Sequence, residues 1–233
     1  MSESLDKVRD IRELPLFPLS IVLFPSVPLP LHIFEPRYRQ MIKDVRETNG
    51  IFGISYFDPS IASLDIPSAG HVGCAAEITE FQPLPEGRYN ILTVGLIRYR
   101  VESYADREDP YLIGRVSFFE DEEDSSEALF TLAREAGAIF TRIARAVRTL
   151  SDDRTYIPDL SDTEPARLSF LIAATIDLAP EVKLELLELT STSQRLERLH
   201  DYLARVVDSY ENRSHAHEIA KTNGHAGKIT PPQ

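Results

Sequence analysis

The sequence predicts an α+β protein in which a strongly bent β-barrel precedes a bundle of α-helices. Three observations support this prediction. Short segments rich in branched and aromatic residues, punctuated by glycine and proline, follow one another up to residue 119. The acidic run "EDEED" at residues 120–124 then marks a sharp change in composition. Beyond it, apolar residues recur at alternating spacings of three and four, the period of an amphipathic helix.

The first predicted strands lie in the apolar stretch "LPLFPLSIVLFPSVPLPLHIF", residues 14–34, which carries no formal charge. A helix of this length would be long enough to cross a bilayer. Its five prolines, however, remove amide donors and disturb helical geometry. Residues before proline favour extended geometry, and proline suits strand starts and edge strands. The stretch therefore predicts short extended segments joined by turns, and no membrane span.

These extended segments lead into one helix. Pro36 suits the first helical position, and the carboxylate of Glu35 before it suits the helix dipole. Apolar residues then recur at helical spacing as far as Val45, and Asn49-Gly50 supplies a C-terminal stop.

Further strands are predicted on β-branched and aromatic content, with a hairpin turn at the Pro-Glu-Gly of residues 85–87. Apolar and charged residues alternate over residues 97–102, which places Arg98 and Arg100 on the solvated side of a half-buried strand. Glycines within or beside these strands suit the bulges and corners of a small barrel. The predicted strands are residues 51–57, 71–84, 88–104 and 111–119.

After the acidic run, which reads as a solvated linker, the predicted helices are residues 129–150, 163–176, 179–189 and 191–210. Ser191 and Gln194 are spaced as a capping box at the start of the last one. Short loops between amphipathic helices predict a bundle. From residue 211 no apolar face continues, which predicts disorder. The chain is thus divided into an N-terminal arm at 1–10, a barrel at 11–120, a helical bundle at 121–210 and a disordered tail at 211–233.

Composition and charge exclude several classes of protein. The chain is 42% hydrophobic and 27% charged, which is typical of a soluble globular protein. A formal charge of −12 disfavours nucleic acid and anionic membranes as partners. Cys74 is the only cysteine, so an intrachain disulfide and a four-thiolate zinc site are both excluded. The mixed charge of the first residues does not fit a secretory signal, and a cytoplasmic location is predicted.

No pattern of residues predicts catalysis, a metal site or a cofactor. The segment "GHAGKIT" at residues 224–230 has too few residues between its glycines for a phosphate-binding loop. His32 lies among apolar residues, where a bond to a backbone group is the simpler role. The remaining candidate ligands lack either partners or a helical spacing: His71 with Cys74, and His215 and His217 with Glu218.

Three segments together resemble one family. "LPLFPLSIVLFPSVPLPLHIFEPRYRQMI" resembles the opening of the Lon protease N-terminal, substrate-binding domain, which is also present in the amino-terminal half of cereblon. "GHVGCAAEITEFQPLPEGRYNILTVGLIRYRVESY" is similar to the family's glycine-punctuated strand pair, and "LSFLIAATIDLAPEVKLELLELTSTSQRLERL" to its helical half. Together they cover about residues 11–208. The resemblance implies a PUA-like β pseudo-barrel followed by an α-helical bundle.

The resemblance also implies a function. A Lon chain continues into an ATPase module and a Ser-Lys protease domain, and this chain is expected to end before either, so it is expected not to be an enzyme. The leading hypothesis is a stand-alone module that binds unfolded or exposed apolar polypeptide segments, as an adaptor or regulator of proteolysis. The proline-punctuated segment would leave an extended edge and apolar side chains available for this. Its partners would be client polypeptides and a Lon-type protease, with a homo-oligomer left open.

Eight residues match the family signature and are predicted to bind protein: Pro25, Leu31, His32, Phe34, Glu35, Pro36, Arg37 and Tyr38. The alternative role for them, to fold the barrel and cap its first helix, stays open. The alternative function is RNA binding, because PUA-like folds elsewhere bind RNA. A strip of Arg88, Arg98 and Arg100 would carry it, against the negative charge of the whole chain.

Overall fold

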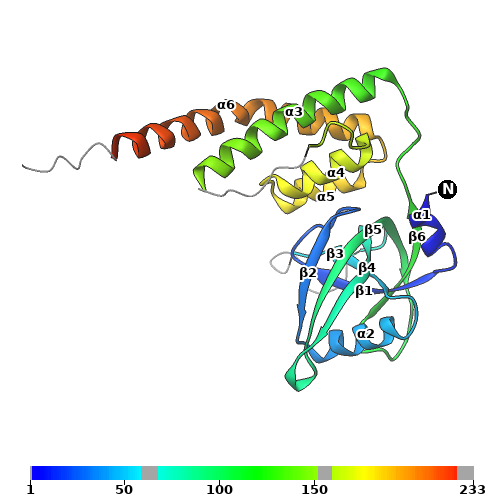
Figure 1. The fold of residues 1–233 in the computed structure, drawn as a ribbon. Coiled ribbons are helices and arrows are strands. Elements are labelled where there is room, and N and C mark those ends of the chain that lie inside the picture. The colour runs from blue at the N-terminus through cyan, green and yellow to red at the C-terminus, as the bar shows by residue number, and fades with distance from the viewer. Residues whose placement is uncertain (1, 59–67, 152–158, 225–233) are drawn as a thin grey trace, which may run out of the picture. The chain divides into compact units, whose positions relative to one another are not determined.

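The computed structural model describes residues 2–58, 68–151 and 159–224 (Figure 1). Strands dominate the first half of the chain and helices the second, which confirms the predicted α+β class. In chain order the elements are α1 (Glu3–Val8), β1 (Glu13–Leu19), β2 (Pro28–Ile33), α2 (Pro36–Arg46), β3 (Ile51–Tyr56), β4 (Val72–Pro83), the short 3₁₀ turn η1 (Pro85–Gly87), β5 (Tyr89–Tyr104), β6 (Leu112–Phe119), α3 (Glu127–Leu150), α4 (Pro165–Thr175), α5 (Pro180–Glu188) and α6 (Thr192–Gly224).

The strands form one sheet that closes on itself. Its order is β2-β5-β4-β3-β1-β6, with a further pairing between β6 and β5. The long strand β5 makes this closure possible, because β4 lines one side of it while β2 and β6 share the other. Only the pairing of β1 with β3 is parallel among those described. The result is the bent barrel that the sequence predicts.

Helix α2 forms where its sequence predicts and packs onto the sheet. Pro36 occupies its first turn, and its four recurring apolar side chains are buried. They join a core cluster with residues of β1, β3 and β4 such as Phe17, Phe52 and Cys74. A second cluster includes Tyr99 and Val8 of α1, a helix that the sequence did not predict in its N-terminal arm.

The turn before β2 crosses β5 at a glycine. Ser26 has a φ of 63° in this turn, and its amide donates to the carbonyl of Gly95 (2.8 Å). A Cβ at Gly95 would lie 2.1 Å from the carbonyl oxygen of Phe24. A larger residue at this position would therefore push the two backbones apart, and the register of β4 and β5 shifts beside it, between Ala75 and Ala76.

Serine hydroxyls cap two of the helices, at Ser126, which was not predicted, and at Ser191, which was. The hydroxyl of Ser126 accepts from the amide of Leu129 (3.2 Å) at the start of α3, and that of Ser191 accepts from Gln194 (3.3 Å) before α6. Helices α3 and α6 lie side by side (Figure 1). None of the helices in the described part of the chain is long and apolar enough to cross a bilayer.

Helix α6 continues beyond the predicted start of disorder at residue 211. It reaches Gly224, and the remaining residues of the predicted tail lie outside the described ranges. The sequence from 211 lacks an apolar face but also lacks proline and glycine until Gly224. Extending an established helix costs little, because each added residue gains a backbone hydrogen bond.

The chain forms two compact units. Unit 1 comprises residues Met1–Glu122 with Ala173–Thr190, and unit 2 comprises Glu123–Ile172 with Ser191–Gln233. This division differs from the predicted one, which placed residues 121–210 in a single bundle. Helix α5 belongs to unit 1, where Glu181 accepts a hydrogen bond from the hydroxyl of Tyr56 on β3 (2.7 Å).

Candidate functional site

Strand β2 has one buried and one exposed face, as the two-residue period of a strand dictates. Leu29, Leu31 and Ile33 pack toward the core cluster of unit 1. The alternate residues are exposed, and the alternation continues to Phe34, whose exposed fraction is 59%. We call these exposed residues the β2 ridge: Pro28, Pro30, His32 and Phe34.

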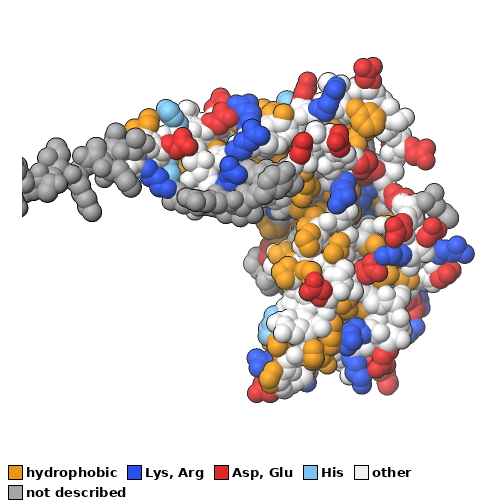
Figure 2. Space-filling model, viewed as in Figure 1, with side chains coloured by type: hydrophobic (Ala, Val, Ile, Leu, Met, Phe, Trp, Pro, Cys, Tyr) orange, Lys and Arg blue, Asp and Glu red, His pale blue; other side chains and the backbone are white. Residues whose placement is uncertain are grey.

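The neighbouring strand widens this apolar surface. Cross-strand partners lie on the same face of a sheet, and in β5 the partners of the ridge are Val94, Leu92 and Asn90. Next along the sheet, β4 places Glu77 and Glu80 opposite Val94 and Leu92. Hydrophobic side chains are interspersed with acidic and basic ones on the face of the barrel in view in Figure 2. The ridge is thus an apolar strip bordered by carboxylates.

The prolines change what the edge of β2 can bind. The amide of Gly95 donates to the carbonyl of Val27 (3.0 Å), which fixes the alternation of hydrogen-bonded pairs in the ladder. Pro28, Pro30 and His32 therefore direct their backbone groups away from β5. Proline has no N–H, so the outer edge offers carbonyl acceptors at both prolines and a donor only at His32. An added strand would leave its own carbonyls unpaired there, so the side chains are the available binding groups.

His32 lies on the ridge and not in the core. Its Nδ1 is 2.8 Å from Oδ1 of Asn90, whose Nδ2 donates to Gln82 (3.4 Å). The expected backbone partner is therefore replaced by a side chain. The imidazole also stacks on the ring of Phe34, with 6.0 Å between ring centroids. These contacts orient two exposed rings side by side.

The other predicted site residues fall into structural positions. Tyr38 is buried, with its ring centroid 4.1 Å from that of Phe17. Arg37 lies over the Tyr38 ring and pairs with Glu35 (3.1 Å), the residue that precedes α2. Pro36 opens that helix. These positions favour a part in folding for these four residues.

Of the remaining two signature residues, Pro25 lies in the turn before β2, and Leu31 packs toward the core. The structure thus brings only His32 and Phe34 together on an exposed surface. Sequence reasoning missed Pro28 and Pro30 as surface residues. Their two-residue spacing with His32 was the signal that could have found them.

The prediction that Arg98 is solvated is wrong. Its side chain is buried, with 1% exposed, and Nη1 donates to the carbonyls of Leu187 (3.0 Å) and Leu189 (2.5 Å). Nη2 pairs with Asp121 (2.5 Å), and the guanidinium lies over the ring of Phe119. The segment that ends α5 covers this face of β5, which local alternation cannot reveal.

The arginine strip proposed for RNA does not form as predicted, because its middle member is buried. Arg88 pairs with Glu86 (3.7 Å), and Arg100 donates to the carbonyl of Gly70 (2.9 Å). These two side chains have local partners and do not continue as one basic surface.

Cys74 and His71 lie where burial opposes their charged forms. Burial raises the pKa of the Cys74 thiol to about 12, so the reactive thiolate is not formed at neutral pH. Burial lowers the pKa of His71, which keeps its imidazole neutral. No group of three or more His, Cys, Asp or Glu side chains within the described ranges could hold a metal ion.

Known proteins resemble this chain over most of its length. Residues 13–205 match the family described as the ATP-dependent protease La (LON) substrate-binding domain. Lon protease 2 of Herpetosiphon aurantiacus is 29% identical over 87% of this chain and 25% of its own length. The Lon protease of Brevibacillus choshinensis is 27% identical over 81% of this chain and 24% of its own. The chain thus spans about a quarter of the length of these curated relatives.

Two solved structures share the fold. A Lon N-terminal domain protein from Xanthomonas campestris aligns with a TM-score of 0.61 and 27% identity, over 81% of this chain and 97% of that one. The N-terminal domain of the Mycobacterium avium complex Lon protease aligns with a TM-score of 0.62 over 82% and 98% of the two chains. Its 18% identity supports the fold alone. With the family match over residues 13–205, we conclude that the chain belongs to the Lon substrate-binding domain family.

Proposed function

We propose that this chain is a non-catalytic binding module that holds exposed apolar segments of unfolded polypeptides on the β2 ridge. It would act as an adaptor or regulator of proteolysis by a Lon-type enzyme. The observation that carries the proposal is the ridge itself, in which Phe34, Pro28 and Pro30 are exposed on the rim of a substrate-binding-family barrel. Contiguous apolar surface of this kind marks interaction sites.

The surroundings of the ridge indicate which client segments it favours. Proline and aromatic faces bind apolar side chains without requiring a defined backbone conformation, which suits clients of varied sequence. Glu80 borders the strip, as does Glu77, which is paired with Lys7 (2.7 Å), and the whole chain carries a charge of −12. Apolar segments flanked by lysine or arginine therefore gain attraction, while acidic segments are repelled.

The binding is expected to be weak. A flexible client loses conformational entropy when it is held, and this cost offsets much of the gain from buried apolar area. Dissociation constants on the order of 10 μM follow, about −7 kcal/mol. Such contacts suit a module that passes clients on rather than storing them.

Fluorescence anisotropy with a labelled, permanently unfolded model protein tests the proposal, with the folded form of the same protein as competitor. We expect the unfolded form alone to bind, and the double variant Pro30→Ser with Phe34→Ser to bind about tenfold more weakly. Because both side chains are exposed, this variant should keep the wild-type circular dichroism spectrum.

Phe130→Ser is the matched control, since Phe130 of α3 is also exposed (48%) but belongs to unit 2. It should bind the unfolded client as wild type does. Equal loss in the control and the ridge variant would remove the ridge as the site. Binding of folded and unfolded forms with equal affinity would sink the proposal itself.

A further inference from the structure

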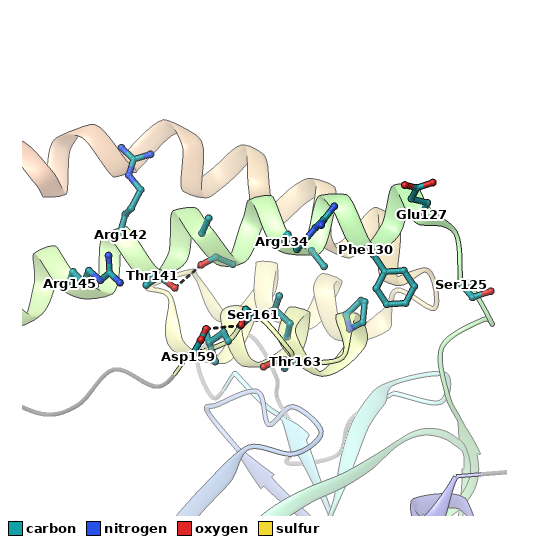
Figure 3. A pocket seen from close by; sticks show the side chains of 16 residues that line it. Ser125, Glu127, Phe130, Arg134, Thr141, Arg142, Arg145, Asp159, Ser161 and Thr163 are labelled. Atoms are coloured by element: carbon teal, nitrogen blue, oxygen red, sulfur yellow. Dashed lines mark hydrogen bonds between the residues drawn. The ribbon is translucent and has the colours of Figure 1, made fainter.

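A second surface lies within unit 2, along helix α3. A groove of about 940 Å³ runs between one face of α3 and residues 159–168 (Figure 3). Its floor consists of small residues, and at Gly137 an added Cβ would lie 3.4 Å from Leu168 of α4. The α3 residues that form the floor are Ala133, Gly137, Ala138 and Thr141.

Cationic side chains flank this floor in a chain that is otherwise acidic. Arg134 and Arg145 are exposed, and both line the groove. The third arginine, Arg142, holds Glu211 of α6 through both guanidinium arms (2.8 Å each), so its charge is already matched. Arg134 donates to the neutral hydroxyl of Thr131 (3.2 Å).

The ends of the groove add one apolar anchor and two carboxylates. Phe130 exposes about half of its side chain one helical turn before Arg134. Glu127 lies near the same end. Asp159, on the opposite wall, accepts from the amide of Ser161 (3.0 Å) in its own loop, and these local bonds hold the pKa of Asp159 below its usual range.

We propose that the groove binds an extended peptide that carries one apolar and two acidic side chains. Charge complementarity with Arg134 and Arg145 selects the acidic groups, and Phe130 selects the apolar one. The two arginines are about 16 Å apart along the helix axis, at 1.5 Å a residue. An extended peptide covers that distance in about five residues, and the apolar side chain falls about two residues beyond the first acidic one.

A protein segment fits this groove better than a nucleic acid does. The floor consists of small residues, and of the three arginines among the described lining residues, Arg142 is already paired with Glu211. Glu127 and Asp159 would repel a continuous row of phosphates, whereas a peptide places its two carboxylates only where the arginines are. The groove is independent of the β2 ridge and belongs to the other compact unit.

The probe is a fluorescein-labelled peptide of about ten residues, with a leucine, an aspartate about two residues later and a second aspartate about five residues further on. Alanine, glycine and serine fill the rest. We expect binding to the full chain with a dissociation constant on the order of 100 μM, which weakens with added salt. A peptide of the same composition with adjacent aspartates should bind about fivefold more weakly, because only one arginine can then be reached.

Charge reversal locates the site. The double variant Arg134→Glu with Arg145→Glu should lose at least tenfold in affinity, while Arg205→Glu, at an exposed arginine of α6 that does not line the groove, should change affinity less than twofold. A peptide with lysine in place of both aspartates should bind the double variant and not the wild type. If the double variant fails to fold, Arg134→Gln with Arg145→Gln replaces it, with the same direction of change.

Two further variants separate this site from the ridge. Phe130→Ser should weaken binding of the acidic peptide and leave binding of the unfolded client unchanged. Phe34→Ser should weaken binding of the unfolded client and leave binding of the acidic peptide unchanged. Equal losses from Arg205→Glu and the groove variant would overturn the proposal, as would equal affinity for peptides with spaced and with adjacent aspartates. Tighter binding of a single-stranded RNA of similar length, lost in the same double variant, would replace the peptide by nucleic acid.

Discussion

Among the residues that the structure describes, units 1 and 2 each bury one arginine but use it differently. In the barrel unit, Arg98 joins segments far apart in the chain, since its guanidinium bonds Asp121 and the carbonyls that end α5. In the helical unit, Arg195 bonds the hydroxyl of Ser169 (2.7 Å) and lies over the ring of Phe170 (4.0 Å). The first fastens a helix to a sheet through polar groups, while the second lies within a unit that apolar side chains already hold together.

The apolar packing of the helical unit lies mainly between α3 and α6. Leucines on α6 that are at most 1% exposed lie on the face that meets α3: Leu196, Leu199 and Leu203. Burial of this kind is non-directional and tolerates small rearrangements, whereas a buried ion pair depends on every partner being in place. The comparison predicts that removal of the buried Arg98 damages unit 1, and that truncation of a leucine between α3 and α6 damages unit 2.

The largest effect is expected from Arg98→Ala. It would remove the buried guanidinium that bonds Asp121 and the carbonyls of Leu187 and Leu189, and should lower the free energy of unfolding by about 3–5 kcal/mol. Urea unfolding followed by circular dichroism measures the loss, and hydrogen exchange with mass spectrometry should place it in unit 1. Arg100→Ala, at the next exposed position of β5, is the control and should cost about 1 kcal/mol or less. Equal losses of stability in the two variants would show that the buried contacts of Arg98 contribute no more to stability than an exposed arginine does.

Leu199→Ala should come next, with a cost of about 3 kcal/mol from lost burial and the cavity left behind. We expect amide hydrogen exchange to become faster in α3 and α6 while the strands of unit 1 keep their protection, which would show that the two units are stabilised separately. Faster exchange throughout both units would contradict separate stabilisation.

The smallest effect is expected from His71 in unit 1. Nε2 of this side chain is buried and has no hydrogen-bond partner among the described residues, and burial lowers the pKa of His71. The unfolded chain therefore takes up a proton below a pH of about 6.5 that the folded chain resists. The contribution of neutral His71 to stability is fully present above that pH, and it is lost as the pH falls toward the lowered pKa of His71 in the folded chain. Urea midpoints at pH 7.5 and 5.5 should show this fall in wild type and a smaller one in His71→Gln; identical pH profiles would exclude His71 as its source.

Local patterns predicted the barrel strands, α2 and the starts of the later helices, because capping residues and periodicity act within a few residues. His32 and Phe34 are exposed because alternate residues of β2 face solvent. The two-residue spacing of Pro28, Pro30 and His32 already indicates this alternation in the sequence. The packing of the barrel did not follow from local patterns. Arg98 has the spacing of a solvated residue and is buried because a segment about 90 positions away covers it.

The helical groove was also beyond sequence reasoning. The small residues of α3 read as part of an amphipathic helix, and nothing local indicates that residues 159–168 lie across them. Helix α6 extends past the predicted start of disorder at residue 211 for another reason. Its last residues lack the apolar face that signals packing, yet they contain no helix breaker before Gly224.

The path of the chain between the units limits how this protein can be cut. The backbone leaves unit 1 after Glu122, returns at Ala173 and leaves again after Thr190. Helix α5 therefore belongs to unit 1, although residues 123–172 of unit 2 separate it from the strands in the sequence. A fragment that stops near residue 120 would lack Asp121, Leu187 and Leu189, whose oxygens bond Arg98, so expressed fragments and domain swaps should carry residues 121–122 and 173–190 along with the strands.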